Sequence, residues 1–123
     1  MTKRILDVGN CGPDHAAITK FFTTHFDCEV AQADRADDAI ELMKATPFDL
    51  VVVNRKLDVD YSDGIDVIAR LKADDQTAAV PVMLITNYAE HQDAAEEAGA
   101  VRGFGKLEYG APETLERVRA VLG

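Results

Sequence analysis

The amino-acid sequence predicts a doubly wound α/β fold, in which one parallel β-sheet is covered by helices on both faces. Segments patterned like short strands alternate five times with segments whose apolar residues recur at helical spacing. Two of the strand-like segments, residues 50–53 and 81–85, are apolar throughout, which is typical of parallel strands buried on both faces. Strands and helices that alternate in this way pair in parallel through right-handed crossovers. The 123 residues are enough for one such domain, spanning residues 1–123.

The first strand and the first helix are separated by a turn. Residues 5–8 predict a short strand, although Asp7 interrupts its apolar run, and Gly9 begins the turn. Pro13 is favoured in the first turn of a helix. Apolar residues then recur at helical spacing, so we expect a helix over residues 13–26.

The middle of the chain contains the clearest strand. Residues 28–33 alternate between apolar and polar side chains and predict a half-exposed strand, and the apolar stripe of residues 36–43 predicts the second helix. Residues 48–53 lead into the continuous apolar run of a central strand. A polar loop at residues 54–63 follows, and the helical spacing of apolar residues in 65–71 predicts the third helix.

The last third of the chain repeats the pattern twice. Residues 81–85 predict a buried strand, and the Ala-rich segment 89–98 predicts a helix that Gly99 ends. Residues 101–105 form a weaker last strand. Pro112 then begins a final helix that ends one residue before the end of the sequence, so we expect the domain to act through a partner or through other parts of a longer protein.

The composition restricts the possible partners and the cellular compartment. The chain has 13 Lys and Arg against 22 Asp and Glu, a formal charge of −9, which argues against binding to nucleic acid or to an anionic membrane. The sequence shows neither a signal peptide nor an apolar run long enough to span a bilayer. Cys11 and Cys28 lack CxxC spacing, so we expect reduced cysteines and a cytoplasmic protein.

A doubly wound sheet also indicates where a ligand would bind. Ligands of such sheets lie outside the carboxyl ends of the strands, where the strand order reverses. In this sequence the loops at that edge hold residues 9–12, 54–58 and 86–87, together with Lys106. These loops form the candidate functional site.

Several motifs along the chain are specific in combination. They are the run 49–53, the pair Asp63 and Gly64 that opens the third helix, the run 81–86, and the pair Gly99 and Ala100 shortly before Lys106. With these motifs the sequence resembles the receiver domain of two-component response regulators, the CheY-like family, over residues 3–122. The resemblance implies a three-layer, flavodoxin-like domain with strand order 2-1-3-4-5.

The resemblance also implies a set of functional positions. The family carries an acidic pair after the first strand that binds Mg²⁺, an Asp phosphoacceptor after the third, a Thr or Ser after the fourth and a Lys after the fifth. Thr86 and Lys106 match the last two positions. However, Asn54 stands at the phosphoacceptor position, and Gly9 and Asn10 align with the acidic pair. An amide forms no acyl phosphate and carries no charge for a hard cation, so the sequence predicts a degenerate receiver.

Two further positions depart from the family near the fifth strand. Leu107 follows Lys106 where the family has a proline. Gly103 stands at the position of the family's aromatic switch residue, and Phe104 is next to it. The departures therefore surround one site.

Two acids near this site have several interpretations. Asp7 breaks a strand that we expect to be buried, and a buried carboxylate needs hydrogen bonds or a cation. It either accepts hydrogen bonds from Lys106 or loop amides, which we favour, or serves as a surrogate metal ligand. Asp58 and Asp60, on the loop after Asn54, are candidates for a surrogate phosphoacceptor, although solvated loop acids are the usual case.

The cations at this edge also have two interpretations. Arg55 and Lys56 follow Asn54 directly. We favour internal pairing of these cations with Asp7, Asp58 or Asp60, and the alternative is a small-anion site that includes Lys106.

The remaining polar candidates receive ordinary structural interpretations. The three histidines have no metal-ligand spacing, and we expect surface or helix-packing roles for His15, His25 and His91. Asp14 lies in the first turn of a helix, where the helix dipole favours a carboxylate.

Our leading hypothesis is an atypical receiver that signals by phosphorylation-independent protein–protein interaction and is not an enzyme. It would present the fourth helix, the fifth strand and the fifth helix to a protein partner, such as a histidine kinase, an output protein or another signalling protein. This hypothesis requires no cofactor. The first alternative is an active receiver in which Asp58 or Asp7 accepts the phosphoryl group with Mg²⁺, and the second is a small-anion sensor at Arg55, Lys56 and Lys106. The partner, the input signal and the oligomeric state do not follow from the sequence.

Overall fold

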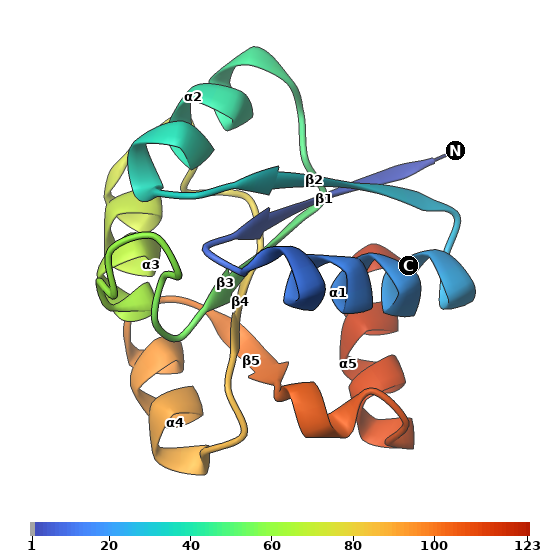
Figure 1. Cartoon of the computed structure of the whole chain (residues 1–123). Coiled ribbons are helices and arrows are strands. Elements are labelled where there is room, and N and C mark those ends of the chain that lie inside the picture. The colour runs from blue at the N-terminus through green and yellow to red at the C-terminus, as the bar shows by residue number, and fades with distance from the viewer. Residues whose placement is uncertain (1) are drawn as a thin grey trace.

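The computed structural model describes residues 2–123 and contains one five-stranded parallel sheet (Figure 1). The strands are β1 (Lys3–Val8), β2 (Cys28–Ala33), β3 (Leu50–Asn54), β4 (Val82–Ile85) and β5 (Val101–Phe104). The helices are α1 (Gly12–His25), α2 (Ala36–Ala45), α3 (Gly64–Ala73), α4 (Ala89–Glu97), the 3₁₀ helix η1 (Lys106–Glu108) and α5 (Pro112–Leu122). The strand order is β2-β1-β3-β4-β5, and every neighbouring pair is parallel. The predicted fold class and strand order are therefore confirmed.

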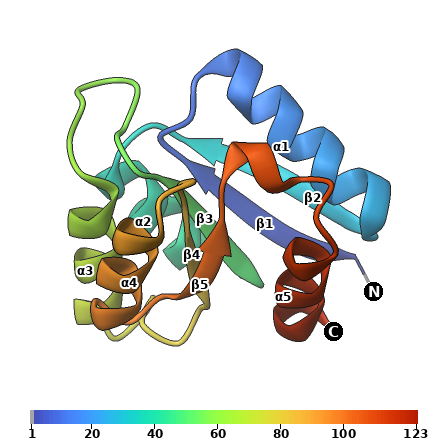
Figure 2. The ribbon, with the colours of Figure 1, turned by 90° about the horizontal axis from the view of Figure 1, so that it is seen from below.

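Helices cover both faces of the sheet, as Figures 1 and 2 show. Helices α1 and α5 cover one face, where Phe22 and Phe104 are fully buried against residues of the strands. Helices α2, α3 and α4 cover the other face, where Leu6 and Ile68 are fully buried. Because side chains alternate along a strand, Asp7 points to the same face as Ile5, toward α1 and α5.

The strand boundaries follow the predicted pattern, with two differences near β5. Strand β2 is at the edge and half-exposed, as its alternating sequence predicts. Strand β5 pairs with β4 through an irregular register, in which Met83 is opposite Val101 and Ile85 is opposite Phe104. The second difference is η1, which the sequence did not predict and which begins at Lys106. In this part of the chain the backbone therefore departs from a regular strand.

A close approach of α3 to β3 fixes the candidate site at the sheet edge. A Cβ atom at Gly64 would lie 2.1 Å from the carbonyl oxygen of Asn54, so only glycine lets α3 begin this close to β3. The side chain of Asp63 caps the helix by accepting a hydrogen bond from the Ile65 amide, at 2.9 Å.

Among residues 2–123, no helix is long and apolar enough to span a membrane.

Candidate functional site

The loops that follow β1, β3 and β5 meet at the carboxyl-end edge of the sheet (Figure 2). The amide nitrogen of Asn54 approaches the Gly9 carbonyl at 3.4 Å, and its amide oxygen lies 3.4 Å from the Lys106 Nζ. Asn54 Nδ2 also donates to the Lys56 carbonyl at 2.7 Å. The structure thus brings together the predicted positions 9, 54 and 106.

Lys106 forms its shortest polar contact with Asp14, a partner that the sequence did not indicate. The Lys106 ammonium donates to Asp14 Oδ2 at 2.7 Å, across 92 positions of sequence. This hydrogen bond lowers the pKa of Asp14 below its ordinary value. The sequence alone suggested that the helix dipole explains the carboxylate of Asp14. The structure corrects this interpretation, because the Asp14 carboxylate at the start of α1 neutralises Lys106.

Asp7 is fully buried and both of its carboxylate oxygens accept hydrogen bonds. Asn10 Nδ2 donates to Oδ1 at 2.5 Å, and His15 Nδ1 lies 2.8 Å from Oδ2 and donates to it when Asp7 is ionised. Of the two expected donors to Asp7, the loop amide is confirmed, because the Asn10 side chain donates to it, whereas Lys106 donates to Asp14 instead. His15 was expected to be a surface or packing residue, and it is a direct polar partner of a buried acid.

Burial raises the pKa of Asp7 above its ordinary value, against the opposing effect of the hydrogen bonds from His15 and Asn10. Between the unfolded and folded pKa values, the native chain keeps a proton that the unfolded chain has lost. The free energy of unfolding therefore falls as pH rises through this window. Asp7→Asn removes this dependence.

We expect the free energy of unfolding of Asp7→Asn to rise relative to wild type as pH increases from about 4, the ordinary pKa of an aspartate, through the raised pKa of Asp7, measured by urea denaturation. The amide also changes local hydrogen bonding, so the readout is the change of the difference with pH and not its absolute size. Asp58→Asn, at an exposed loop acid, is the control. If the difference in the free energy of unfolding between Asp7→Asn and wild type stays constant over this pH range, the raised pKa of Asp7 is contradicted.

Gly9 has a backbone conformation and a neighbour that exclude a side chain. Its φ angle is +82°, in the left-handed region that favours glycine. A Cβ atom at position 9 would lie 2.6 Å from Leu57 Cγ, and Leu57 is 1% exposed. Leu57 therefore fills the space beside a position that aligns with the family's acidic pair. No motif in the sequence indicated this contact.

Thr86 is connected to the β3–α3 loop through His91. Arg55 Nε donates to His91 Nε2 at 3.2 Å, so the ring proton of His91 is on Nδ1, which lies 3.3 Å from Thr86 Oγ1. His91 thus has a specific polar role beyond the expected surface or packing role. The Tyr88 amide also approaches Thr86 Oγ1, at 3.3 Å.

The predicted internal pairing of Arg55 and Lys56 is wrong. Among residues 2–123, neither cation forms an ion pair. Asp60 accepts hydrogen bonds from Ser62 and pairs with Arg35 at 3.8 Å, whereas Asp58 is exposed. Arg55 reaches α4 while Lys106 reaches α1, so the two cations are held by different elements.

The position of the family's aromatic switch residue is closed in this chain. A Cβ atom at Gly103 would lie 2.3 Å from the Leu84 carbonyl oxygen. The neighbouring Phe104 is fully buried and packs against Phe21 and Tyr109, with ring centroids 5.5 and 6.0 Å away. Phe104, the aromatic residue next to Gly103, is therefore part of the core and not of the surface.

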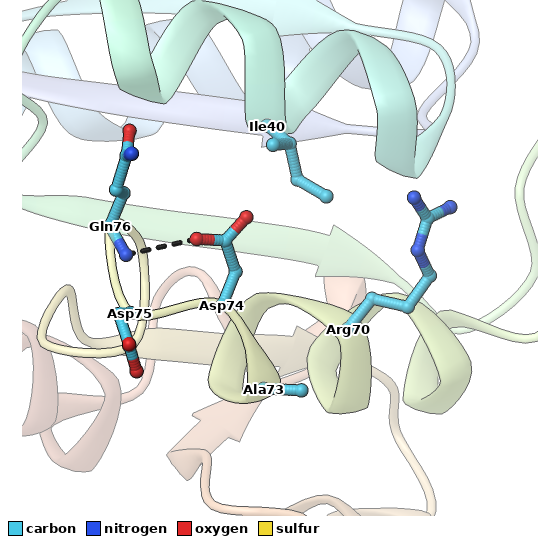
Figure 3. Close-up of a pocket in the computed structure, with 6 residues that line it drawn as sticks. All are labelled: Ile40, Arg70, Ala73, Asp74, Asp75 and Gln76. Atoms are coloured by element: carbon cyan, nitrogen blue, oxygen red, sulfur yellow. Dashed lines mark hydrogen bonds between the residues drawn. The ribbon is translucent and has the colours of Figure 1, made fainter.

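A pocket of about 570 Å³ lies between α2 and the end of α3 (Figure 3). Ile40 and Arg70 line it from the two helices, and Asp74 accepts a hydrogen bond from the Gln76 amide at 2.9 Å. None of the predicted site residues lines this pocket. It is therefore separate from the site at the carboxyl ends of the strands.

The model of the response regulator receiver domain family matches residues 13–107. No curated protein matches the sequence significantly. The fold is similar to that of the signal receiver domain of a DNA binding response regulator (merR) from Colwellia psychrerythraea 34H, with a TM-score of 0.79, 20% identity and 98% coverage of both chains. A putative response regulator from Chloroflexus aurantiacus J-10-fl has a TM-score of 0.81 and 19% identity, with 99% of this chain and 98% of that chain covered.

NtrX from Brucella abortus has the same fold within a longer chain. Its TM-score is 0.74 at 22% identity, and the alignment covers 98% of this chain but 28% of NtrX. These identities support the likeness of fold, and the match of the family model to more than half of the sequence supports membership. The chain belongs to the response regulator receiver domain family.

Proposed function

We propose that this receiver domain signals by binding a protein partner and is not phosphorylated at the end of β3. The observation that carries the proposal is the side chain of Asn54. It occupies the last position of β3 with an amide whose nitrogen is bonded to the Lys56 carbonyl. An amide cannot act as a carboxylate nucleophile toward a phosphoryl donor, so the expected acyl phosphate has no residue on which to form at this position.

The side chains at this edge also do not fit Mg²⁺, which prefers several hard oxygen ligands in octahedral geometry. Both oxygens of Asp7 accept hydrogen bonds within the protein, and Asp14 is bonded to Lys106. Gly9 contributes no side chain, and Leu57 occupies the adjacent space. Among the described residues, no group of three or more His, Cys, Asp or Glu side chains is arranged for a metal.

Neither surrogate acid, Asp7 or Asp58, is well placed to accept a phosphoryl group. Asp7 is 0% exposed, so a phosphoryl donor has no direct access to its carboxylate. Asp58 is exposed on the β3–α3 loop, where its backbone amide donates to the Gly9 carbonyl at 2.9 Å. Exposed loop residues lack the fixed placement that an in-line transfer needs.

The small-anion alternative requires converging cations, and the contacts of Arg55 and Lys106 lead to different helices. We therefore propose a signalling module rather than an enzyme or an anion sensor. Its partner would be a histidine kinase, an output protein or another signalling protein.

Intact-mass measurement after incubation with acetyl phosphate and Mg²⁺ tests this proposal. We expect no stable gain of one phosphoryl group, because the nucleophile and the metal ligands are both missing. A receiver domain that carries the Asp phosphoacceptor, treated in parallel, shows that the donor is active. A stoichiometric phosphoryl adduct overturns the proposal, and fragment masses that place it on Asp58 or Asp7 identify the surrogate.

A further inference from the structure

A second pocket lies between α1 and the segment that joins η1 to α5 (Figure 2). Its volume is about 380 Å³, within the range of about 300 to 1,000 Å³ that is usual for small-ligand sites. We call it the α1 pocket. Helix α1 lines it from one side and Tyr109 from the other, and its lining residues on α1 are Ala17, Lys20, Phe21, Thr24 and His25. None of the predicted site positions Gly9, Asn54, Thr86 and Lys106 lines it.

The α1 pocket has an aromatic wall. The ring centroid of Phe21 lies 5.1 Å from that of Tyr109, with an angle of 33° between the ring planes, and 5.4 Å from that of His25. From the core side, the fully buried Phe104 packs against both Phe21 and Tyr109. The wall is therefore ordered before a ligand binds, which lowers the entropic cost of binding. A planar aromatic ring is the ligand group that such a wall favours most.

The polar side chains of the α1 pocket favour an anionic group on the ligand. Lys20 lines the pocket, and among residues 2–123 no Asp or Glu does. Within the same residues, Lys20 forms no ion pair. A carboxylate on the ligand therefore gains the Lys20 ammonium as a partner without displacing an internal ion pair.

The acids of the flanking elements lie outside the α1 pocket. They are Asp14 on α1, Asp27 directly after α1, Glu108 on η1, and Glu113 and Glu116 on α5. The Asp14 carboxylate is paired with Lys106 at 2.7 Å, and the Glu108 carboxylate accepts a hydrogen bond from the Gly105 amide at 2.8 Å. The fixed charge that a ligand in the pocket meets directly is therefore the Lys20 ammonium.

We propose that the α1 pocket binds a small planar aromatic molecule that carries one carboxylate. The ring packs against Phe21 and Tyr109, and the carboxylate is directed toward Lys20. The volume of the pocket suits a ligand of one or two fused rings. This site shares no residue with the small-anion alternative at Arg55, Lys56 and Lys106. It also goes beyond the proposed function, since it requires neither a protein partner nor the side chain of Asn54.

NMR titrations of the ¹⁵N-labelled full chain with three probes that share one ring system test the charge preference. Naphthoate is an anion, naphthylmethanol is neutral and naphthylmethylammonium is a cation. We expect naphthoate to bind saturably, with a dissociation constant of about 1 mM or lower, and about threefold more tightly than naphthylmethanol. The formal charge of −9 favours the cation in non-specific binding. Binding of naphthylmethylammonium as tight as that of naphthoate, or no saturable binding of naphthoate, overturns the proposal.

A fourth probe and the location of the shifts test the aromatic wall. Decalin carboxylate is an anion of similar size without an aromatic ring, and we expect it to bind at least about threefold more weakly than naphthoate. The amide shifts caused by naphthoate should centre on residues 17–25 and 109–110. Equal binding of decalin carboxylate, or shifts centred elsewhere in the chain, overturns the proposal.

Two neighbouring alanines on α1 provide a matched pair of variants. Ala16 and Ala17 are both exposed, but of these two residues only Ala17 lines the pocket. Leucine is a good helix former, so we expect both Ala17→Leu and Ala16→Leu to keep α1 folded, which circular dichroism checks. Ala17→Leu fills the pocket and should weaken binding of naphthoate and of naphthylmethanol by at least about fivefold. Ala16→Leu should leave both affinities unchanged, and equal effects of the two variants overturn the proposal.

Lys20→Gln separates the charge of the pocket from its shape. We expect it to weaken naphthoate binding about threefold and to leave naphthylmethanol binding unchanged. Lys56→Gln, at an exposed lysine outside the pocket, is the control and should change neither affinity. Unchanged naphthoate binding in Lys20→Gln overturns the proposal. The phosphorylation test is independent: a phosphoryl adduct contradicts the proposed function, whereas failed naphthoate binding contradicts only the ligand of the α1 pocket.

Discussion

Gly9→Asp is expected to lower the free energy of unfolding by about 3 kcal/mol, the combined scale of an unfavourable backbone conformation and of overpacking. This substitution restores one carboxylate at a position that aligns with the family's acidic pair. The new Cβ atom would meet Leu57 Cγ at 2.6 Å, with a φ angle of +82°. Urea denaturation measures the effect.

Two controls make this result specific. Gly110→Asp adds a carboxylate at a glycine with nothing within 4 Å of the new Cβ position, and its effect should stay within about 0.5 kcal/mol. Leu57→Ala removes the obstructing side chain, so Gly9→Asp should cost at least about 1 kcal/mol less in that background. Strictly additive effects contradict the view that Leu57 closes this position.

Phe104→Ala should destabilise the domain by about 3 to 5 kcal/mol, the range for removing a buried phenyl ring from a core. Phe104 is 0% exposed and packs against Phe21, Phe22 and Tyr109. The edge-to-face arrangement with Phe22 adds to the area that the ring buries. Urea denaturation and thermal unfolding both measure this loss.

The result also bears on signalling, because Phe104, the aromatic residue next to Gly103, would then be a core residue and not a mobile switch. Leu107→Ala is the control at a neighbouring apolar residue, 86% exposed, and should change the free energy of unfolding by less than about 0.5 kcal/mol. A cost below about 1 kcal/mol for Phe104→Ala indicates that the ring moves freely.

Much of the fold could be predicted from local patterns. The apolar runs of β3 and β4 identified the central strands, and the alternating pattern of β2 identified a half-exposed edge strand. The loops after successive strands then defined the edge where Asn54 and Lys106 meet. These features depend on periodicity and chain order, which a single sequence contains.

The partners within the site could not be predicted, because they depend on exact backbone placement. Whether His15 faces Asp7 is decided by the shape of the β1–α1 turn. The pairing of Lys106 with Asp14 joins residues 92 positions apart, and the contact of Leu57 with Gly9 depends on the path of the β3–α3 loop. A buried acid such as Asp7 signals that some partner exists, but its spacing does not name that partner.

Internal contacts of Gly9, Asn10, Asn54 and Lys106 take the place of a metal and phosphoryl site in this chain. A titration with MgCl₂, followed by ¹⁵N NMR of the full chain, tests whether Mg²⁺ binds there. We predict that the amide signals of these four residues show no saturable shift into the tens of millimolar, apart from the gradual drift caused by ionic strength. Saturable shifts centred on these residues, with a dissociation constant in the low millimolar range or below, contradict it.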